Sequence, residues 1–414
     1  MNSHSPIEPM AGDSPPGPYD DAAGDGLVRD DQLQAGLGEP LSQALDIGRW
    51  HDGTALATDV QRVEQEVADA LKQQDRVRQQ ARAKLLGEID SPDRPDKPKG
   101  AGVVRVTRQQ LERVQNGLLF AGAVDACVGT AAAHDTLPVT VAQVGVCLVS
   151  YLGSRGAWGH RLFYRDLRLS GGGDPVGEMM EVLHRRIERT ANRRPGQRDP
   201  LSELARRGIR SYAERAVLLE RSDARWVIGR GHPAPYELIT GSGSMEFLRL
   251  SLDMLRRLIL DRRRFVFIAS RPQEDRLLMS IGDALIPLEF AIVDRDELRT
   301  RPIVEEGNLR GEHRSRALDF VNDVIDKLVV GVYRTGLHSP PQIFYAHQDY
   351  AEQAALVAMA DSTLQPFRSY PTLLDLSGAV VDSLFGPEAF EATVQNAYAR
   401  GGQALRFAFD GSAR

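Results

Sequence analysis

The pattern of apolar and polar positions divides the chain into three parts. Residues 1–45 are rich in Pro, Gly, Asp and Ser and have no periodic apolar positions. We expect this tail to be disordered, because it cannot bury enough apolar surface to offset the entropy of ordering. Residues 46–100 hold a long polar stretch, Ala55–Ile89, with valines at helical spacing, and then a Pro-rich linker. They predict an amphipathic helical extension, and residues 101–414 predict one folded domain.

Two apolar runs near the start of this domain predict its first strands. Leu118–Val124 ends on Asp125, and Val139–Tyr151 follows after a connection of small and polar residues. Arg161–Leu169 predicts a third strand, so the three would form an antiparallel meander. A carboxylate at the end of a buried strand is held rigidly, as a ligand of Mg²⁺ or Mn²⁺ must be.

Helices and short strands alternate after the meander. A strand within Ala234–Gly243, the helix Met245–Leu260 and the buried strand Phe265–Ser270 would form a β-α-β unit. Further strands are expected at Leu288–Val293, Ile343–His347 and Leu405–Phe409. Helical segments are expected at Thr107–Gln115, Gly177–Thr190, Leu201–Arg221, Arg316–Val330, Tyr350–Leu364 and Ser369–Phe385. This order predicts an α/β fold, a mixed sheet with helices on both faces, and fits the ribonuclease-H-like class.

Composition narrows the class of protein. The chain has 414 residues, 42% of them hydrophobic, and a formal net charge of -6, which is ordinary for a globular protein. No apolar run is long enough to span a bilayer and the first residues lack a signal sequence, so we expect a cytoplasmic protein that does not bind membranes. The two cysteines, Cys127 and Cys147, are expected to be reduced core residues. The slight acidity argues against nucleic-acid binding by bulk charge but not against a local basic patch.

Three segments of the domain resemble the motifs of the NurA nucleases. The first motif, a strand that ends in an Asp, is similar to GAVDACVGTAAAHDTLPVTVAQVGV. The second, a strand that runs into an acidic turn and a helix, is similar to ELITGSGSMEFL. The third, a Tyr-Pro step before a helix that carries a catalytic His, is similar to SYPTLLDLSGAV. The resemblance extends from about Gln115 to the end of the chain.

The resemblance implies a DNA nuclease that hydrolyses phosphodiester bonds at DNA ends with Mn²⁺ or Mg²⁺. It also implies a HerA-type hexameric ATPase as a partner, a homodimer, and a role in DNA repair or defence. The first catalytic acid of the family falls on Asp125. A second acid is expected on the helix between the first two motifs, at Glu214 or Glu220. We favour Glu220, because it lies closer to the following strand in the sequence.

The chain departs from the family at three motif positions. Ala126 replaces a glycine, Thr240 stands where the second motif has an acid, and Gly378 stands where the third has its His. One acid cannot hold a hard cation tightly. Carboxylates that could complete the metal site by position are Asp135, Glu237 and Asp375. The departures also support an alternative, a catalytically inactive structural or regulatory subunit.

Arginines cluster in two stretches that could neutralise DNA phosphates. They are Arg185, Arg189, Arg193, Arg194, Arg206 and Arg207. The alternative interpretation is a solvated helix face balanced by acidic residues. The GSGS turn at Gly241–Ser244 opens a helix and could cradle a phosphate, but it lacks the lysine of a P-loop, and a plain tight turn is the other interpretation.

Overall fold

The structure of the chain, a computed structural model, describes residues 34, 37–50, 56–90, 97–135, 140–164, 203–307 and 309–401. The tail at residues 1–33, the helix expected at Gly177–Thr190 and the strand expected at Leu405–Phe409 lie outside these residues. The chain divides into two compact units, Met1–Gln74 and Asp75–Arg414.

The first unit contains helix α2 (Leu41–Ala44) and most of α3 (Leu56–Ala81). The predicted long helix is therefore present. Its valines Val60, Val63 and Val67 are 49%, 61% and 51% exposed. The division between the units falls inside α3, upstream of the Pro-rich linker where the sequence suggested a boundary.

The end of the long helix is part of the second unit. A π-helical turn (Arg82–Leu86) leads into α4 (Gly87–Asp90), and Leu86 and Ile89 are buried in a core cluster. Arg82 donates two hydrogen bonds to Glu289, of 2.6 and 2.9 Å. Burial of the two apolar residues, rather than the composition of the linker, decides where this unit begins.

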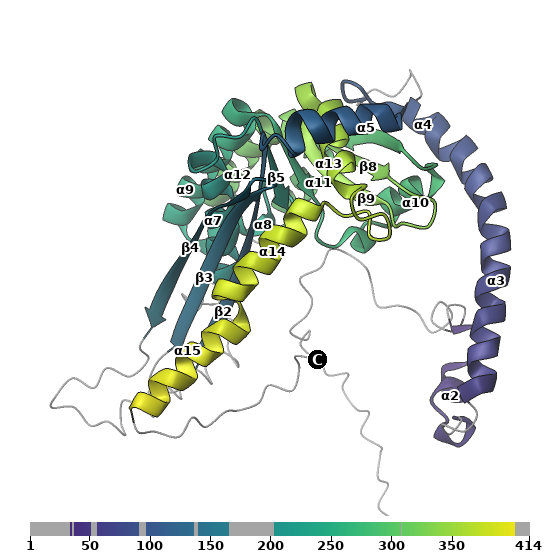
Figure 1. Ribbon diagram of the computed structural model, residues 1–414, viewed down its shortest axis with the longest axis horizontal. Helices are drawn as coiled ribbons and strands as arrows, with labels where there is room; N and C mark the ends of the chain where they lie inside the picture. Colours follow the sequence, from purple (N-terminus) through teal and green to yellow (C-terminus); the bar gives the residue numbers. More distant parts are fainter. Residues whose placement is uncertain are drawn as a thin grey trace, which may run out of the picture. The chain divides into compact units, whose positions relative to one another are not determined.

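A nine-stranded mixed sheet organises the second unit, in the order β1-β7-β8-β9-β6-β5-β2-β3-β4 (Figure 1). Its strands β2, β3 and β4 form the antiparallel meander, and β5 and β6 add to β2 in parallel. The mixed α/β prediction is confirmed, and the ribonuclease-H-like class stays a prediction. The strands are β1 (Gly102–Arg105), β2 (Val124–Asp135), β3 (Thr140–Ser150), β4 (Gly153–Tyr164), β5 (Trp226–Arg230), β6 (Phe265–Ile268), β7 (Glu289–Arg295), β8 (Leu328–Arg334) and β9 (Gln342–His347).

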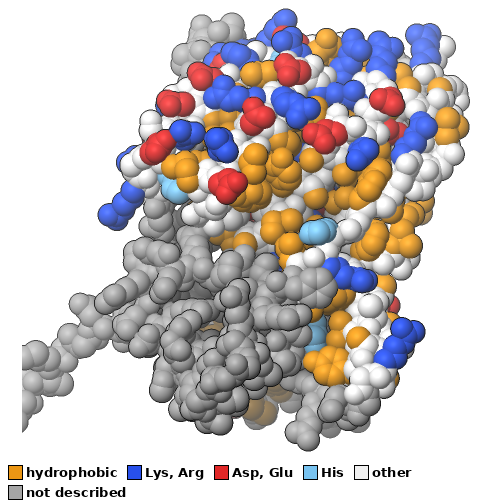
Figure 2. Space-filling view, turned by 90° about the vertical axis from the view of Figure 1, so that its left-hand side faces the viewer, with side chains coloured by type: hydrophobic (Ala, Val, Ile, Leu, Met, Phe, Trp, Pro, Cys, Tyr) orange, Lys and Arg blue, Asp and Glu red, His pale blue; other side chains and the backbone are white. Residues whose placement is uncertain are grey.

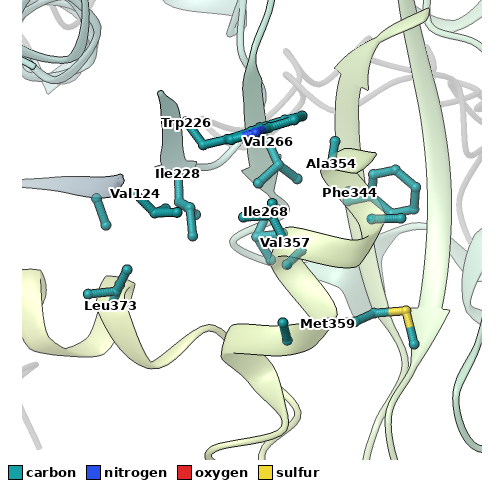
Figure 3. Close-up of a cluster of buried hydrophobic side chains, with 14 of the residues drawn as sticks. Val124, Trp226, Ile228, Val266, Ile268, Phe344, Ala354, Val357, Met359 and Leu373 are labelled. Carbon is teal, nitrogen blue, oxygen red and sulfur yellow. The ribbon is translucent and has the colours of Figure 1, made fainter. Parts of the chain in front are cut away.

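Helices cover both faces of this sheet. Helices α5, α13 and α14 pack on one face, and α7, α9 and α12 pack on the other. Figure 3 shows the first of these clusters, with Val124 and Ile228 of the sheet facing Leu373 of α14. The helices are α5 (Arg108–Val114), α7 (Glu203–Glu220), α8 (Tyr236–Ile239), α9 (Met245–Arg256), α10 (Arg276–Ala284), α11 (Glu297–Glu306), α12 (Glu312–Asp323), α13 (Ala351–Ser362), α14 (Thr372–Phe385) and α15 (Pro387–Arg400).

The placement of the first strand was wrong. Leu118 lies in a π-helical turn, Gln115–Leu119, and β2 begins only at Val124. Asp125 is therefore the second residue of a twelve-residue strand instead of following its end. The small residues that suggested a loop are strand residues, because helices approach β2 closely from both faces: Ala126 lies in one core cluster and Cys127 in the other.

The strand expected within Ala234–Gly243 was also wrong, and the neighbouring strand β5 was missed. Tyr236–Ile239 is helical and a 3-10 turn follows at Gly241–Gly243. Pro235, which precedes the helix, has a fixed φ and starts the turn, so the apolar pair Leu238 and Ile239 is buried from a helix instead of a strand.

Two glycines of the meander allow the end of α14 to pack closely against it. Gly145 and Gly159 are partners across β3 and β4, and the Phe385 side chain lies over both. A Cβ at Gly159 would come within 2.5 Å of the Phe385 ring, and one at Gly145 would overlap the same side chain. The close approach of α14 to the sheet therefore depends on both glycines.

We expect Gly145→Ala to lower the free energy of unfolding by about 1–3 kcal/mol, because the added methyl group displaces Phe385. Gly378→Ala on the same helix is the control. A Cβ at Gly378 meets no atom within 4 Å, so alanine should be neutral or stabilise the helix by about 0.5–1 kcal/mol. Urea denaturation of both variants tests this prediction, and equal stabilities would contradict it.

Candidate functional site

Asp125 is buried where β2 begins, and protein groups use both of its oxygens. Its side chain is 3% exposed. Oδ2 accepts a hydrogen bond of 2.7 Å from the Ser222 hydroxyl, and Oδ1 lies 3.4 Å from Nε of Arg155. The carboxylate therefore ties the turn after α7 and the start of β4 to the beginning of β2. Its burial leaves a DNA phosphate no direct approach to it.

Asp135 lies at the other end of the same strand. The two aspartates are ten residues apart on β2, which corresponds to about 33 Å at 3.3 Å per residue. Asp375 lies on α14 and forms an ion pair of 2.6 Å with Arg368. This separation along the strand is too long for one metal ion to contact both positions, and the Asp375 carboxylate is paired with Arg368.

The two remaining predicted acids also have other partners. Glu220 is more than half exposed at the end of α7 and lies 3.4 Å from Arg257. Glu237 of α8 accepts a hydrogen bond of 2.6 Å from the Ser211 hydroxyl. The expected convergence of these carboxylates around Asp125 is therefore absent from the described part of the chain.

Glu214, not Glu220, is the acid of α7 that faces the sheet. The pairing of β2 with β5 ends at Cys127 and Gly229. Beyond it, the Gly129 N–H donates to Oε1 of Glu214 at 2.8 Å. The approach requires glycine, since a Cβ at Gly129 would lie 2.9 Å from Cγ of Glu214. Glu214 thus replaces a missing strand partner.

The second oxygen of Glu214 forms a buried ion pair. Nη1 of Arg215 lies 2.8 Å from Oε2, and the two side chains are 2% and 7% exposed. The same guanidinium donates to the backbone carbonyls of Ser211, Pro233 and His232 at 3.0, 2.9 and 2.5 Å. Burial lowers the pKa of Arg215, and the carboxylate beside it acts in the opposite direction. The charge of Glu214 is compensated within the protein.

A cleft of about 370 Å³ opens beside this pair, at the carboxyl ends of β5 and β6. Ligands of open α/β sheets bind in such places. Positive and negative groups both line it. The basic residues are Arg210, Arg215, Arg230 and Arg271, and the acidic ones are Glu214, Glu237 and Glu274. His232 closes one side, with Nε2 2.7 Å from Asp296.

The motif positions that depart from the family have structural contacts of their own. The Thr240 hydroxyl donates to the carbonyl of Tyr236 at 2.8 Å, within the turn after α8. Beside Gly378, the Ser377 hydroxyl accepts from the Val128 N–H at 2.9 Å and donates to the Cys147 carbonyl at 2.8 Å. The polar group that α14 turns toward the sheet therefore bridges β2 and β3.

A buried carboxylate from α13 holds the start of α14. Pro371, which precedes α14, provides no side-chain cap. Oδ2 of Asp361 instead accepts the Leu373 N–H at 3.0 Å, and Oδ1 accepts a short hydrogen bond from the Tyr151 hydroxyl. Burial raises the pKa of Asp361 from its ordinary value of 3.8 to about 6, although both hydrogen bonds lower it. Asp361 is an acid that the sequence analysis did not single out.

Only part of the arginine prediction falls on described residues. Arg206 is half-buried and Arg207 is exposed, both on α7. Arg185, Arg189, Arg193 and Arg194 lie outside the described residues. On the face drawn in Figure 2, basic side chains alternate with acidic and apolar ones and do not form a surface of one sign.

The Mn²⁺ or Mg²⁺ that the family resemblance implies does not fit the donors that the described residues provide. A hard cation needs several carboxylate oxygens that are free to coordinate it. Those of Asp125 are taken by Ser222 and Arg155, and those of Glu214 by Gly129 and Arg215. Across the described ranges, no group of three or more His, Cys, Asp or Glu side chains could hold a metal ion.

Burial along α7 in the structure distinguishes Glu214 from Glu220. Ser211, Glu214, Arg215 and Leu218 are buried at the spacing i, i+3, i+4 and i+7, which defines one face of a helix. Glu220 lies off this face. Proximity in sequence to the next strand was therefore the wrong criterion for choosing between the two acids.

Comparison with known proteins gives matches among solved structures alone. No family model and no curated protein matches the chain. No described helix is both long and apolar enough to cross a membrane. The NurA nuclease from Sulfolobus solfataricus aligns with 82% of this chain and 98% of its own, at 8% identity and a TM-score of 0.43.

Two further NurA structures align in the same way. One, bound to dAMP and manganese, covers 84% of this chain and 98% of its own at 8% identity, with a TM-score of 0.38. Another, with manganese, covers 74% and 96% at 7% identity, with a TM-score of 0.36. These three NurA structures thus align with 74% to 84% of this chain at 7% to 8% identity.

Proposed function

We propose that this chain is a catalytically inactive, NurA-like structural or regulatory subunit that binds DNA beside a HerA-type hexameric ATPase. One observation carries the proposal. The two buried carboxylates on the meander side of the sheet, Asp125 and Glu214, are both neutralised by donors from the protein itself. The motif resemblance supplies the DNA and the ATPase as the expected partners.

Metal-dependent hydrolysis needs a cation that lowers the pKa of an attacking water and stabilises charge on the phosphate. Glu214 would have to release Arg215, a fully buried guanidinium, before it could coordinate such a cation. That change leaves an uncompensated charge in the interior and costs several kcal/mol. We therefore derive no hydrolytic step for this cleft.

Binding of a phosphate without hydrolysis requires no metal ion, only positively charged groups within reach of the phosphate oxygens. Arg210, Arg230 and Arg271 line the cleft next to the buried pair. Arg206 and Arg207 lie about one turn before Arg210 on α7. Guanidinium groups bind phosphate oxygens in a bidentate manner, so these arginines supply contacts for a DNA backbone, with an affinity that falls as salt rises.

The second candidate function is the metal-dependent nuclease acting at DNA ends. The observation that favours it is that Glu237 and Glu274 add two carboxylates to the cleft beside the paired Glu214, although the three do not form a group that could hold a metal ion in the described structure. In this case the chain would be an active enzyme that forms a homodimer, works with the HerA-type ATPase and acts in DNA repair or defence.

A cleavage assay separates the two functions. The purified chain is incubated with linear single- and double-stranded DNA and Mn²⁺ or Mg²⁺, with and without a HerA-type ATPase. We expect no cleavage, and DNA binding that weakens at high salt and in Arg210→Ala and Arg230→Ala. Asp125→Asn should bind DNA like the unchanged chain, because Asp125 does not line the cleft.

Cleavage would overturn the proposal if it were lost in Glu237→Gln and retained in Glu220→Gln. These two variants form a matched pair, since both remove one carboxylate charge and only Glu237 lines the cleft. Cleavage that persists in both variants but is lost in Asp125→Asn would also overturn the proposal, and only cleavage that persists in all three variants indicates a contaminating nuclease. Absence of both cleavage and DNA binding would leave the ATPase as the only partner to test, by co-purification.

A further inference from the structure

A second cleft, of about 410 Å³, lies at the opposite end of β5, where Arg225 precedes Trp226, the first residue of the strand. The described structure around it comes from α5, the following π-helical turn, the start of β5 and α13. Its floor is apolar and includes Leu118, Trp226 and Leu356. The volume is within the range of small-molecule sites, about 300–1,000 Å³. None of the residues discussed for the first cleft lines it.

Aromatic side chains form one wall of this cleft. Tyr350 stands edge-on to Trp226, with ring centroids 6.3 Å apart and an interplanar angle of 90°. The guanidinium carbon of Arg264 lies 5.3 Å from the centroid of the Tyr350 ring. In Figure 3, Trp226 lies at the margin of the core cluster beside Val266, so the core holds the indole in place. Trp226 is 4% exposed, so the surrounding core fixes its position, and Tyr350 beside it contributes an aromatic ring to the cleft.

The rim carries positive charge without a matching acid. Arg113, Arg225 and Arg264 line the cleft, and none of the described lining residues carries a carboxylate. Within the described residues, none of the ion pairs includes these three arginines. The nearby carboxylate of Asp349 is engaged elsewhere, 3.7 Å from Lys99 and 3.9 Å from Arg263. Three guanidinium groups beside an apolar floor match the chemistry of a ligand with an anionic head and an apolar body.

We propose that this cleft binds a nucleotide phosphate, with the base against the floor and the aromatic wall and the phosphate on the arginines. A fatty acid would also have an apolar body, but its single carboxylate does not match three guanidinium groups. Phosphates offer several oxygens for bidentate contacts. The ligand is either a free nucleotide or the 5′-phosphorylated end of a DNA strand. This inference does not depend on the function proposed for the first cleft.

The test measures binding to the full chain by calorimetry and by tryptophan fluorescence, since Trp226 lies in the floor. The probes are AMP, ATP, inorganic phosphate, oleate, and an oligothymidylate with and without a 5′-phosphate. We expect AMP and ATP to bind more tightly than inorganic phosphate, because the base adds apolar contacts. Arg225→Glu and Arg264→Glu should each weaken binding about tenfold or more.

Arg221→Glu is the matched control, since Arg221 is also exposed, lies four residues before Arg225 and does not line the cleft. It should leave nucleotide affinity unchanged. Melting curves show whether each variant folds, and Arg225→Gln serves where Arg225→Glu does not. Tight binding of AMP identifies a free nucleotide. Preference for the 5′-phosphorylated oligonucleotide over the unphosphorylated one identifies a strand end.

Three results would overturn the inference. The first is no binding of any nucleotide or oligonucleotide at millimolar concentration. The second is binding that Arg225→Glu and Arg264→Glu leave unchanged. The third is saturable binding of oleate alone, which would mean that the floor selects an acyl chain.

Discussion

Replacement of Glu214 by alanine should lower the free energy of unfolding by about 3–5 kcal/mol. The change leaves Arg215 buried without its counter-ion, and removal of one partner of a buried ion pair has effects of this size. It also leaves the Gly129 N–H without an acceptor, because β5 has already ended at Arg230. Urea denaturation followed by circular dichroism measures the loss.

Three further variants separate charge from packing. Glu214→Gln keeps an acceptor for Gly129 and should be less destabilising than alanine. Arg215→Met added to Glu214→Leu should recover part of the loss, because no unpaired charge remains buried. Glu220→Ala, an exposed acid on the same helix, should cost less than about 1 kcal/mol. A Glu214→Ala variant as stable as the unchanged chain would refute the buried pair.

The second large effect is a dependence of stability on pH through Asp361. Its pKa is about 6 in the folded chain and 3.8 as the ordinary value. An acid with a raised folded pKa contributes stability that is fully present below its unfolded pKa and is lost as pH rises through its folded pKa. The loss between those limits is about 3 kcal/mol, at 1.36 kcal/mol per pKa unit. On the order of 1 kcal/mol of it falls between pH 5 and 8.

Asp361→Asn isolates this contribution, because asparagine does not titrate and can still accept the Leu373 N–H. The stability of the unchanged chain minus that of the variant should therefore fall as pH rises from 5 to 8. Tyr151→Phe tests the other contact. It removes the hydroxyl that donates to Asp361, a hydrogen bond that lowers the pKa of the carboxyl, so the pKa should rise further. A difference between unchanged chain and Asp361→Asn that is constant with pH would contradict the assignment.

The sequence predicted correctly those elements that are decided by interactions between residues close together in the chain. It failed for elements that depend on packing between distant residues. The capping box that starts α5 lies within Thr107–Gln110, so the helix expected at Thr107–Gln115 is present. The meander strand Val139–Tyr151 could be predicted because its residues are buried on both faces and carry a continuous apolar run. The strand at residues 124–135 could not be predicted, because its small residues are typical of a loop. Small residues are needed there because helices pack on both faces of β2.

The sequence by itself determined the mixed α/β class, the existence of the meander, and the special character of Asp125 as an acid in an apolar setting. Only the tertiary structure decided what that acid does. Its two partners, Ser222 and Arg155, lie 97 and 30 residues away, and Glu214 meets Gly129 across 85 residues. Local side-chain patterns determine helices and strands. Contacts between distant residues decide whether a carboxylate is free to bind a metal ion or is already bound to groups of the protein.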